Sequence, residues 1–147
     1  MLLKGLKQLM LSGSCFVLTA FAEEPLPDLE VRVSGAEAQS GQLLLSLFDS
    51  EESYLKEPLL ERRIPVNGEG EGIFLIESLE TGVYAVSVIY DEDSDGELDT
   101  GLFGIPKEKI GMSNNAKSSF GPPSFEKTRF ELNSSISIDI FLDDVSD

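Results

Sequence analysis

Apolar and polar residues alternate along several short stretches of the chain, as expected for strands with one buried face. Residues 29–34 read Leu-Glu-Val-Arg-Val-Ser, and residues 136–142 place isoleucine or leucine at every second position. Residues 43–48 are apolar at positions that would face both sides of a sheet, which predicts a central strand. Further strands are predicted at residues 60–66, 73–79, 83–90 and 125–132, with turn residues such as Asn67-Gly68 between them.

Seven short strands separated by turns predict an all-β fold. We expect a seven-stranded antiparallel sandwich, immunoglobulin-like or transthyretin-like, over residues 29–143, with a linker at 23–28 and a tail at 144–147. A short helix capped by Asp49 is expected through Lys56. Tyr84 lies near the start of a strand, where we expect its hydroxyl to tie a turn rather than to act in catalysis.

Residues 91–124 show no strand or helix pattern, and 34 residues are too many for an ordinary connection. Glycines and prolines in this segment suit fixed turns, so we expect one long ordered loop. The apolar residues expected to anchor the loop to the sandwich are Leu98, Leu102, Phe103, Ile105, Ile110, Met112 and Phe120. Long ordered loops on rigid sheets often carry function.

The N-terminal segment 1–22 has the three parts of a secretory signal. Lys4 and Lys7 supply the positive start, residues 9–21 are mostly apolar, and Ala20-Phe21-Ala22 fits a cleavage site. A buried N-terminal helix is the alternative interpretation. Cleavage after Ala22 would remove the single cysteine, and it predicts a periplasmic or extracellular protein with no membrane-inserted segment.

Composition excludes several classes of site. The chain has 11 basic and 27 acidic residues, no histidine and one cysteine, with a formal net charge of -16. The absence of histidine rules out Ser-His-Asp triads and histidine metal sites. The negative charge argues against binding to nucleic acid or anionic lipid, both of which need a cationic face. We therefore expect no enzyme of the common nucleophilic classes.

One acidic segment has the spacing of a metal-binding loop. Residues 91–99 read Asp-Glu-Asp-Ser-Asp-Gly-Glu-Leu-Asp, which matches the front of an EF-hand calcium loop, with acids at positions 1, 3, 5 and 9 and glycine at 6. Alternate side chains turn inward around the ion, Gly96 permits the sharp bend, and Leu98 would plug the loop into the core. The candidate calcium ligands are Asp91, Asp93, Asp95, Glu97, Asp99 and Glu108.

The match to the EF-hand loop is incomplete. Position 12 is Leu102, where an EF-hand has a bidentate glutamate, and the preceding segment is a predicted strand. The missing ligand must therefore come from Glu108, from Asn114 or Asn115, or from water. The alternative is a solvated acidic turn without metal. Magnesium fits less well than calcium because it tends to keep its waters.

Basic residues are few. Arg62 and Arg63 could bind an anionic ligand, but the simpler interpretation places them on the outer face of an edge strand. Lys107, Lys109 and Lys117 are expected to counterbalance the acidic loop.

Three segments follow the acidic loop: Gly-Ile-Pro-Lys-Glu at 104–108, Ser-Asn-Asn-Ala at 113–116 and Phe-Gly-Pro-Pro-Ser-Phe at 120–125. In this order, with residues 91–100 before them, they resemble the bacterial secreted family known as domain of unknown function number 2141. The resemblance extends over about residues 29–142, and it implies a periplasmic or extracellular β-sandwich with no assigned activity. The serine and asparagines at 113–115 could form a sugar pocket, but hydrogen bonding to nearby backbone is the favoured interpretation.

Three functions are compatible with these features. The first is a secreted β-sandwich binding module for an unknown protein or glycan partner, with calcium fixing the long loop. The second is a structural acidic domain without metal. The third is a carboxylate-dependent glycan hydrolase, which needs two carboxyl groups roughly 5–9.5 Å apart in a cleft. The acidic loop and the lack of common catalytic groups favour the binding module.

Overall fold

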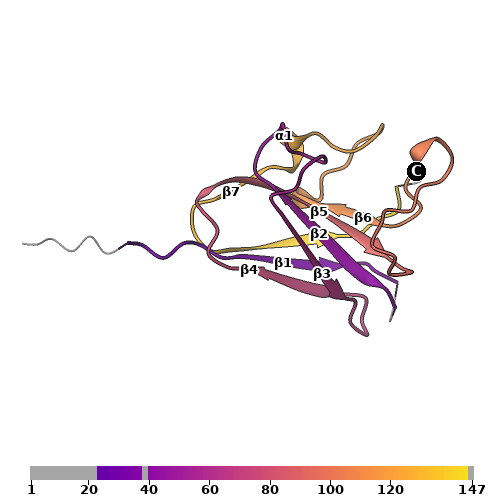
Figure 1. Cartoon of the computed structure of the whole chain (residues 1–147), viewed down its shortest axis with the longest axis horizontal. Helices are drawn as coiled ribbons and strands as arrows, with labels where there is room; N and C mark the ends of the chain where they lie inside the picture. Colours follow the sequence, from indigo (N-terminus) through magenta and orange to yellow (C-terminus); the bar gives the residue numbers. More distant parts are fainter. Residues whose placement is uncertain (1–22, 38–39, 146–147) are drawn as a thin grey trace, which may run out of the picture.

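The computed structural model describes residues 23–37 and 40–145, so the expected signal segment lies outside the described residues. Eight strands form two facing sheets, which confirms the all-β sandwich (Figure 1). The strands are β1 (Leu29–Ser34), β2 (Gln42–Phe48), β3 (Leu60–Pro65), β4 (Gly72–Ile76), β5 (Gly82–Asp91), β6 (Ile110–Met112), β7 (Phe130–Leu132) and β8 (Ile136–Phe141). Short helical turns are η1 (Leu102–Gly104), η2 (Ser113–Asn115) and α1 (Phe125–Thr128). Among the described residues, no helix has the length and apolar character needed to cross a bilayer.

The smaller sheet has the strand order β4-β1-β8. β1 pairs antiparallel with β4 but parallel with β8, where Leu29 lies opposite Ile136. The expectation of a fully antiparallel sandwich is therefore wrong for this pair. Alternation along a strand shows which face is buried, but the direction of its neighbour depends on connections far away in the chain.

The larger sheet has the order β3-β2-β5-β6, and β7 also pairs with β5. β2 lies between β3 and β5, as its two apolar faces predicted. β6 pairs with residues 87–89 of β5 and β7 with residues 82–84, so these two short strands share one edge of β5. β6 lies inside the segment that we expected to contain no strand, because three residues around a glycine give no alternating pattern.

Two local predictions are wrong. Residues 125–128 form α1 instead of the first half of a strand, and only residues 130–132 are extended. The backbone N–H groups of Lys127 and Thr128 donate to the carbonyl of Ser124, which starts this single helical turn. Residues 51–56 form turns instead of a helix, and Leu55 has a φ of 55°, which ends any helical path.

The core lies between the two sheets and consists of alternate residues of the strands. Its fully buried side chains include Leu29, Val31, Val33, Leu43, Leu45, Leu47, Val86, Val88, Leu132, Ile140 and Leu142. A smaller cluster contains Phe48, Tyr54 and Ala85, against which Phe125 packs. All described strands and both clusters lie between Leu29 and Leu142, so residues 23–147 hold the complete sandwich and are expected to fold on their own.

The structural role predicted for Tyr84 agrees with its contacts. Its hydroxyl donates a hydrogen bond of 2.9 Å to the carbonyl of Glu80, across the turn that precedes β5. We expect Tyr84→Phe to lower the free energy of unfolding by about 1 kcal/mol, because one intramolecular hydrogen bond is lost while the ring stays packed. Urea unfolding of the variant measures this, and an unchanged free energy would show that the hydroxyl does not hold the turn.

Candidate functional site

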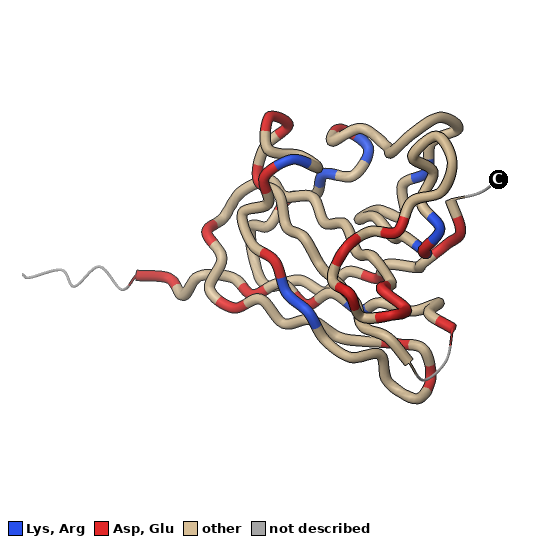
Figure 2. Tube along the Cα trace, turned by 45° about the vertical axis from the view of Figure 1, so that its right-hand side comes forward, with Lys and Arg blue, Asp and Glu red and all other residues tan. Residues whose placement is uncertain are grey.

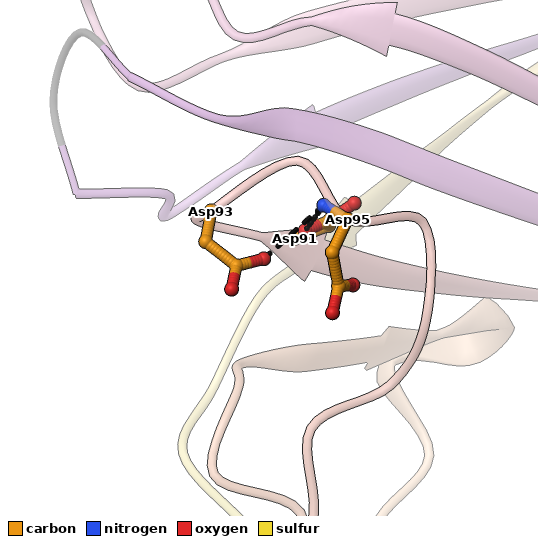
Figure 3. A group of neighbouring side chains, drawn as sticks. All are labelled: Asp91, Asp93 and Asp95. Carbon is orange, nitrogen blue, oxygen red and sulfur yellow. Dashed lines mark hydrogen bonds between the residues drawn. The ribbon is translucent and has the colours of Figure 1, made fainter.

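Three aspartates of the acidic loop come together where β5 ends (Figure 3). Asp91 is the last residue of β5 and is fully buried, whereas Asp93 and Asp95 are exposed. One carboxylate oxygen from each of the three lies within 4.8 Å of the others. The loop therefore offers a group of hard oxygen ligands with one buried member at its base.

Hydrogen bonds to Asp91 hold the loop in this shape. Its Oδ2 accepts from the Gln42 side chain at 2.6 Å and from the backbone N–H of Gly96 at 2.8 Å, and its Oδ1 accepts from the N–H of Asp95 at 3.2 Å. Burial opposes ionisation, but the hydrogen bonds from Gln42 and Gly96 outweigh it and hold the pKa of Asp91 below its ordinary value. The buried Asp91 carboxylate is therefore the fixed point of the acidic loop, since the backbone of the loop is hydrogen-bonded to it.

The exposed aspartates make local hydrogen bonds that keep the chain curved. Asp93 Oδ1 accepts from the N–H of Asp95 at 3.2 Å, and Asp95 Oδ1 accepts from the N–H of Glu97 at 2.8 Å. Gly96 has a φ of +84°, in the left-handed region that favours glycine. A Cβ at this position would also lie 2.8 Å from Nη1 of Arg63, so a larger residue would displace the end of this flexible side chain.

Glu108, which was predicted as a calcium ligand, accepts hydrogen bonds from the backbone of the acidic loop. Its Oε1 accepts from the N–H of Glu92 at 3.2 Å and its Oε2 from the N–H of Asp99 at 3.1 Å, so it joins the two ends of the loop. Burial, with the charges of Asp91 and Asp99, raises the pKa of Glu108 against these hydrogen bonds. Glu108 thus also constrains the loop, although its negative charge lies close to those of Asp91 and Asp99.

The remaining predicted ligands lie outside the group of three. In the described part of the chain, the close carboxylates are those of Asp91, Asp93 and Asp95, and the group does not include Glu97, Asp99 or Glu108. Glu97 and Asp99 are exposed. Leu98 is half-buried and belongs to neither apolar cluster, so the expectation that it plugs the loop into the core is wrong. The acidic loop is held by polar contacts instead.

The lysines do not neutralise the acidic loop, contrary to expectation. Lys109 pairs with Glu37 at 3.1 Å, and Lys117 pairs with Asp143. Among the described residues, no ion pair involves an acid of segment 91–99. Acidic segments are spread over the fold in Figure 2, and those of the loop lie close together. Its carboxylates therefore repel one another, and Arg63, whose guanidinium lies beside Gly96, forms no ion pair with them.

Ser113 has a structural role. Its buried hydroxyl accepts from the N–H of Val86 at 2.9 Å and donates to the carbonyl of Thr128 at 2.6 Å. The edge of β5 is covered by β7 at residues 82–84 and by β6 at residues 87–89. Ser113 therefore supplies a partner for the strand in the gap between them.

The two asparagines also bind backbone. Asn114 Nδ2 donates to two carbonyl oxygens beside α1, at 3.1 and 2.8 Å. Asn115 Nδ2 donates to the carbonyl of Asp139 at 3.2 Å, and its Oδ1 accepts from the N–H of Phe141 at 2.8 Å, so it pairs with β8 as a strand residue would. These contacts support the interpretation that the motif fixes the loop.

Sequence reasoning missed Gln42 and the position of Arg63. Gln42 lies directly opposite Asp91 in the pairing of β2 with β5, so the correct strand register would have revealed the contact. Arg63 lies on the edge strand β3, as expected, and its guanidinium covers Gly96. Neither contact can be predicted from the sequence without knowing which strands are neighbours.

A family model described as "Uncharacterized protein conserved in bacteria (DUF2141)" matches residues 31–139. This range includes most of β1, all of β2 to β7, most of β8, the acidic loop and the Ser-Asn-Asn-Ala segment. Neither a curated protein nor a solved structure matches the chain. Because the matched range spans most of the chain, and the motifs that carried the resemblance lie inside it, the protein belongs to this bacterial family.

Proposed function

We propose that the protein is an exported β-sandwich binding module whose acidic loop, residues 91–99, holds a structural calcium ion. The observation that carries this proposal is the group formed by Asp91, Asp93 and Asp95, with carboxylate oxygens within 4.8 Å of one another. Calcium takes six to eight oxygen ligands at roughly 2.3–2.6 Å, from carboxylates, backbone carbonyls and water. The Glu97 carbonyl, Asp99 and water are candidates for the remaining positions.

The charge of the loop supports a bound cation. Neighbouring carboxylates a few ångströms apart repel by on the order of 1 kcal/mol even in water-like surroundings. The ion pairs of the described residues leave these acids without a basic partner. A divalent ion would remove this repulsion and would also relieve the unfavourable position of the Glu108 carboxylate. In this proposal the ion fixes the acidic start of the long loop, residues 91–99, and this rigid part is the surface for a protein or glycan partner outside the cytoplasm.

Hydrolysis by a pair of carboxylates is supported less well. It needs two carboxyl groups that flank a cleft, one of them with a raised pKa. Glu108 has a raised pKa, but both its oxygens accept backbone hydrogen bonds. The two best-formed hollows of the described surface are lined by other residues.

Calcium is expected to raise the thermal unfolding midpoint of residues 23–147. Extracellular calcium modules bind in the roughly 0.1–1 mM range, so 10 mM calcium exceeds the dissociation constant by about 10- to 100-fold. Linkage then gives about 1.4–2.7 kcal/mol of stabilisation, or roughly 5–10 °C for a domain of this size. Calorimetric scans in chelator, 10 mM calcium and 10 mM magnesium measure this shift, and magnesium should have a smaller effect.

Two matched variants make the test specific to the loop. Asp93→Asn with Asp95→Asn keeps the side-chain oxygens that accept from the backbone but removes two ligand charges. Glu51→Gln with Glu52→Gln makes the same charge change in an exposed turn. The first variant should lose most of the calcium shift, and the second should keep it. Equal shifts in both, or no shift in the parent protein, would overturn the proposal.

A further inference from the structure

Two loops beyond the acidic loop expose apolar side chains in a segment with very few acids. Between Asp99 and Glu126 the only acid is Glu108, although the chain has 27 in all. The first tip comprises residues 100–107 and the second tip residues 117–123. Their most exposed side chains are Leu102 at 84%, Phe103 at 98%, Phe120 at 93% and Ile105 at 48%. The expectation that these residues anchor the loop to the sandwich is therefore wrong.

Two backbone hydrogen bonds close the first tip. The N–H of Lys107 donates to the carbonyl of Asp99 at 2.9 Å, and the N–H of Gly101 donates to that of Ile105 at 2.7 Å. These bonds close a narrow turn, and its base is joined to the acidic loop through Glu108. Phe103 has a φ of +65°, which is unfavourable for a bulky residue. The fold thus keeps a large aromatic side chain in water at a conformational cost.

The second tip has a fixed base as well. Pro123 is buried, and its carbonyl accepts a hydrogen bond of 2.9 Å from the Tyr54 hydroxyl. Ser118 Oγ donates to the carbonyl of Phe120 at 3.1 Å, which tightens the turn around the exposed ring. In Figure 1 both tips lie in the upper right part of the molecule.

We infer that the two tips dock the protein on an uncharged lipid surface. They are two separate exposed turns, and neither lines the hollow beside Arg32 and Ile64 or the hollow beside Glu30 and Leu75. Exposed apolar side chains mark protein or membrane interaction sites, and lipid headgroups without net charge match the absence of acids at the two tips. Insertion of the tips into the interface is a peripheral contact and does not require a spanning segment.

The charges around the tips fit a zwitterionic bilayer. Lys107 is the only charged residue of the first tip, and Lys117 of the second tip is paired with Asp143. The tips are therefore close to neutral and free of acids, while the net charge of -16 on the whole chain repels anionic lipid. Phosphatidylcholine and phosphatidylethanolamine surfaces match this distribution. The inference does not depend on bound calcium, since the turns are closed by hydrogen bonds of the protein.

Tryptophan fluorescence tests the inference directly, because the chain has no tryptophan. Phe103→Trp and Phe120→Trp each place one fluorophore at a tip, and Phe141→Trp places one at a side chain on β8 that is 59% exposed. With residues 23–147 and vesicles of phosphatidylcholine and phosphatidylethanolamine, the emission of both tip variants should shift to shorter wavelength. The emission of the β8 variant should not shift. The result should be the same in chelator and in calcium.

Co-sedimentation with the same vesicles measures the contribution of the tips. Leu102→Ser, Phe103→Asn and Phe120→Ser combined should weaken vesicle binding about tenfold or more, since three exposed apolar groups are removed. Asparagine tolerates the left-handed conformation at 103, so the unfolding midpoint should not fall. The control combines Ile73→Ser, Leu75→Ser and Phe141→Ser, which are similarly apolar and exposed on the smaller sheet. No blue shift at the tips, or equal losses in the two triple variants, would overturn the inference.

Discussion

Asp91→Asn should destabilise the protein by about 3 kcal/mol even in chelator. The carboxylate is fully buried and accepts hydrogen bonds from Gln42, Gly96 and Asp95 through both its oxygens. An amide has one acceptor oxygen, so its NH2 group would face the backbone N–H of Gly96 or that of Asp95, whichever way it is turned. Each buried donor left without a partner costs about 1–3 kcal/mol, and bonds to a charged acceptor are the stronger kind. Urea unfolding in chelator measures this loss.

Asp93→Asn is the matched control for this substitution. Asp93 is exposed, and the single hydrogen bond that it accepts from the N–H of Asp95 can be made by an amide oxygen. Loss of its charge also reduces repulsion within the loop, by less than about 1 kcal/mol for exposed groups. The ion-free protein should therefore keep its stability or gain slightly. If Asp91→Asn and Asp93→Asn behave alike in chelator, Asp91 is not the fixed point of the loop.

The free energy of unfolding should also depend on pH through the ionisation of Asp91 and Glu108. The pKa of Asp91 is lowered in the folded state, so its contribution is present above about pH 4, the ordinary range of an aspartate, and is lost as pH falls through the folded value. The pKa of Glu108 is raised, so its contribution is present at low pH and is lost as pH rises through the folded value. In chelator, stability should rise as pH falls from the raised pKa of Glu108 toward the ordinary glutamate value of about 4.3, and it should fall below about pH 4. Asp91→Asn should remove much of the final fall.

Alternation of apolar and polar residues predicted most of the sandwich. Residues 29–34 were expected as a strand and are β1, and the doubly apolar stretch at 43–48 is the central strand β2. The prediction of these strands succeeds because the apolar residues within a strand indicate which of its faces is buried. The direction of β8 and the presence of β6 depend on the neighbours of each strand, and no local pattern records them.

The acidic loop could be predicted because its pattern also lies within a short stretch of sequence, whereas its contacts with distant residues could not. The spacing of acids around Gly96 is local, and the structure brings the three aspartates together. Gln42 joins the site only through the pairing of β2 with β5, and Glu108 through the return of the chain. The apolar residues of the tips were misjudged because hydrophobicity alone predicts burial. The hydrogen bonds that close the turn around Phe103 are made between residues of the loop itself.

Ser113→Ala should lower the free energy of unfolding by about 2–4 kcal/mol. The serine hydroxyl completes the edge of β5 where neither β6 nor β7 reaches, by accepting from the N–H of Val86 and donating to the carbonyl of Thr128. Alanine would leave both buried backbone groups without this partner, at about 1–3 kcal/mol each, with partial relief by relaxation. Denaturant unfolding of residues 23–147 measures the change.

Ser118→Ala separates this effect from the general loss of a hydroxyl. Ser118 is exposed and donates only to the carbonyl of Phe120, so its removal should change stability by less than about 0.5 kcal/mol. A ligand-binding serine would show the reverse pattern, with unchanged stability for Ser113→Ala. The buried position of the hydroxyl argues for the structural role, because a group that replaces a missing strand partner is not free to meet a ligand. Stability of Ser113→Ala equal to that of the parent protein would overturn that role and make residues 113–115 the first place to search for a ligand.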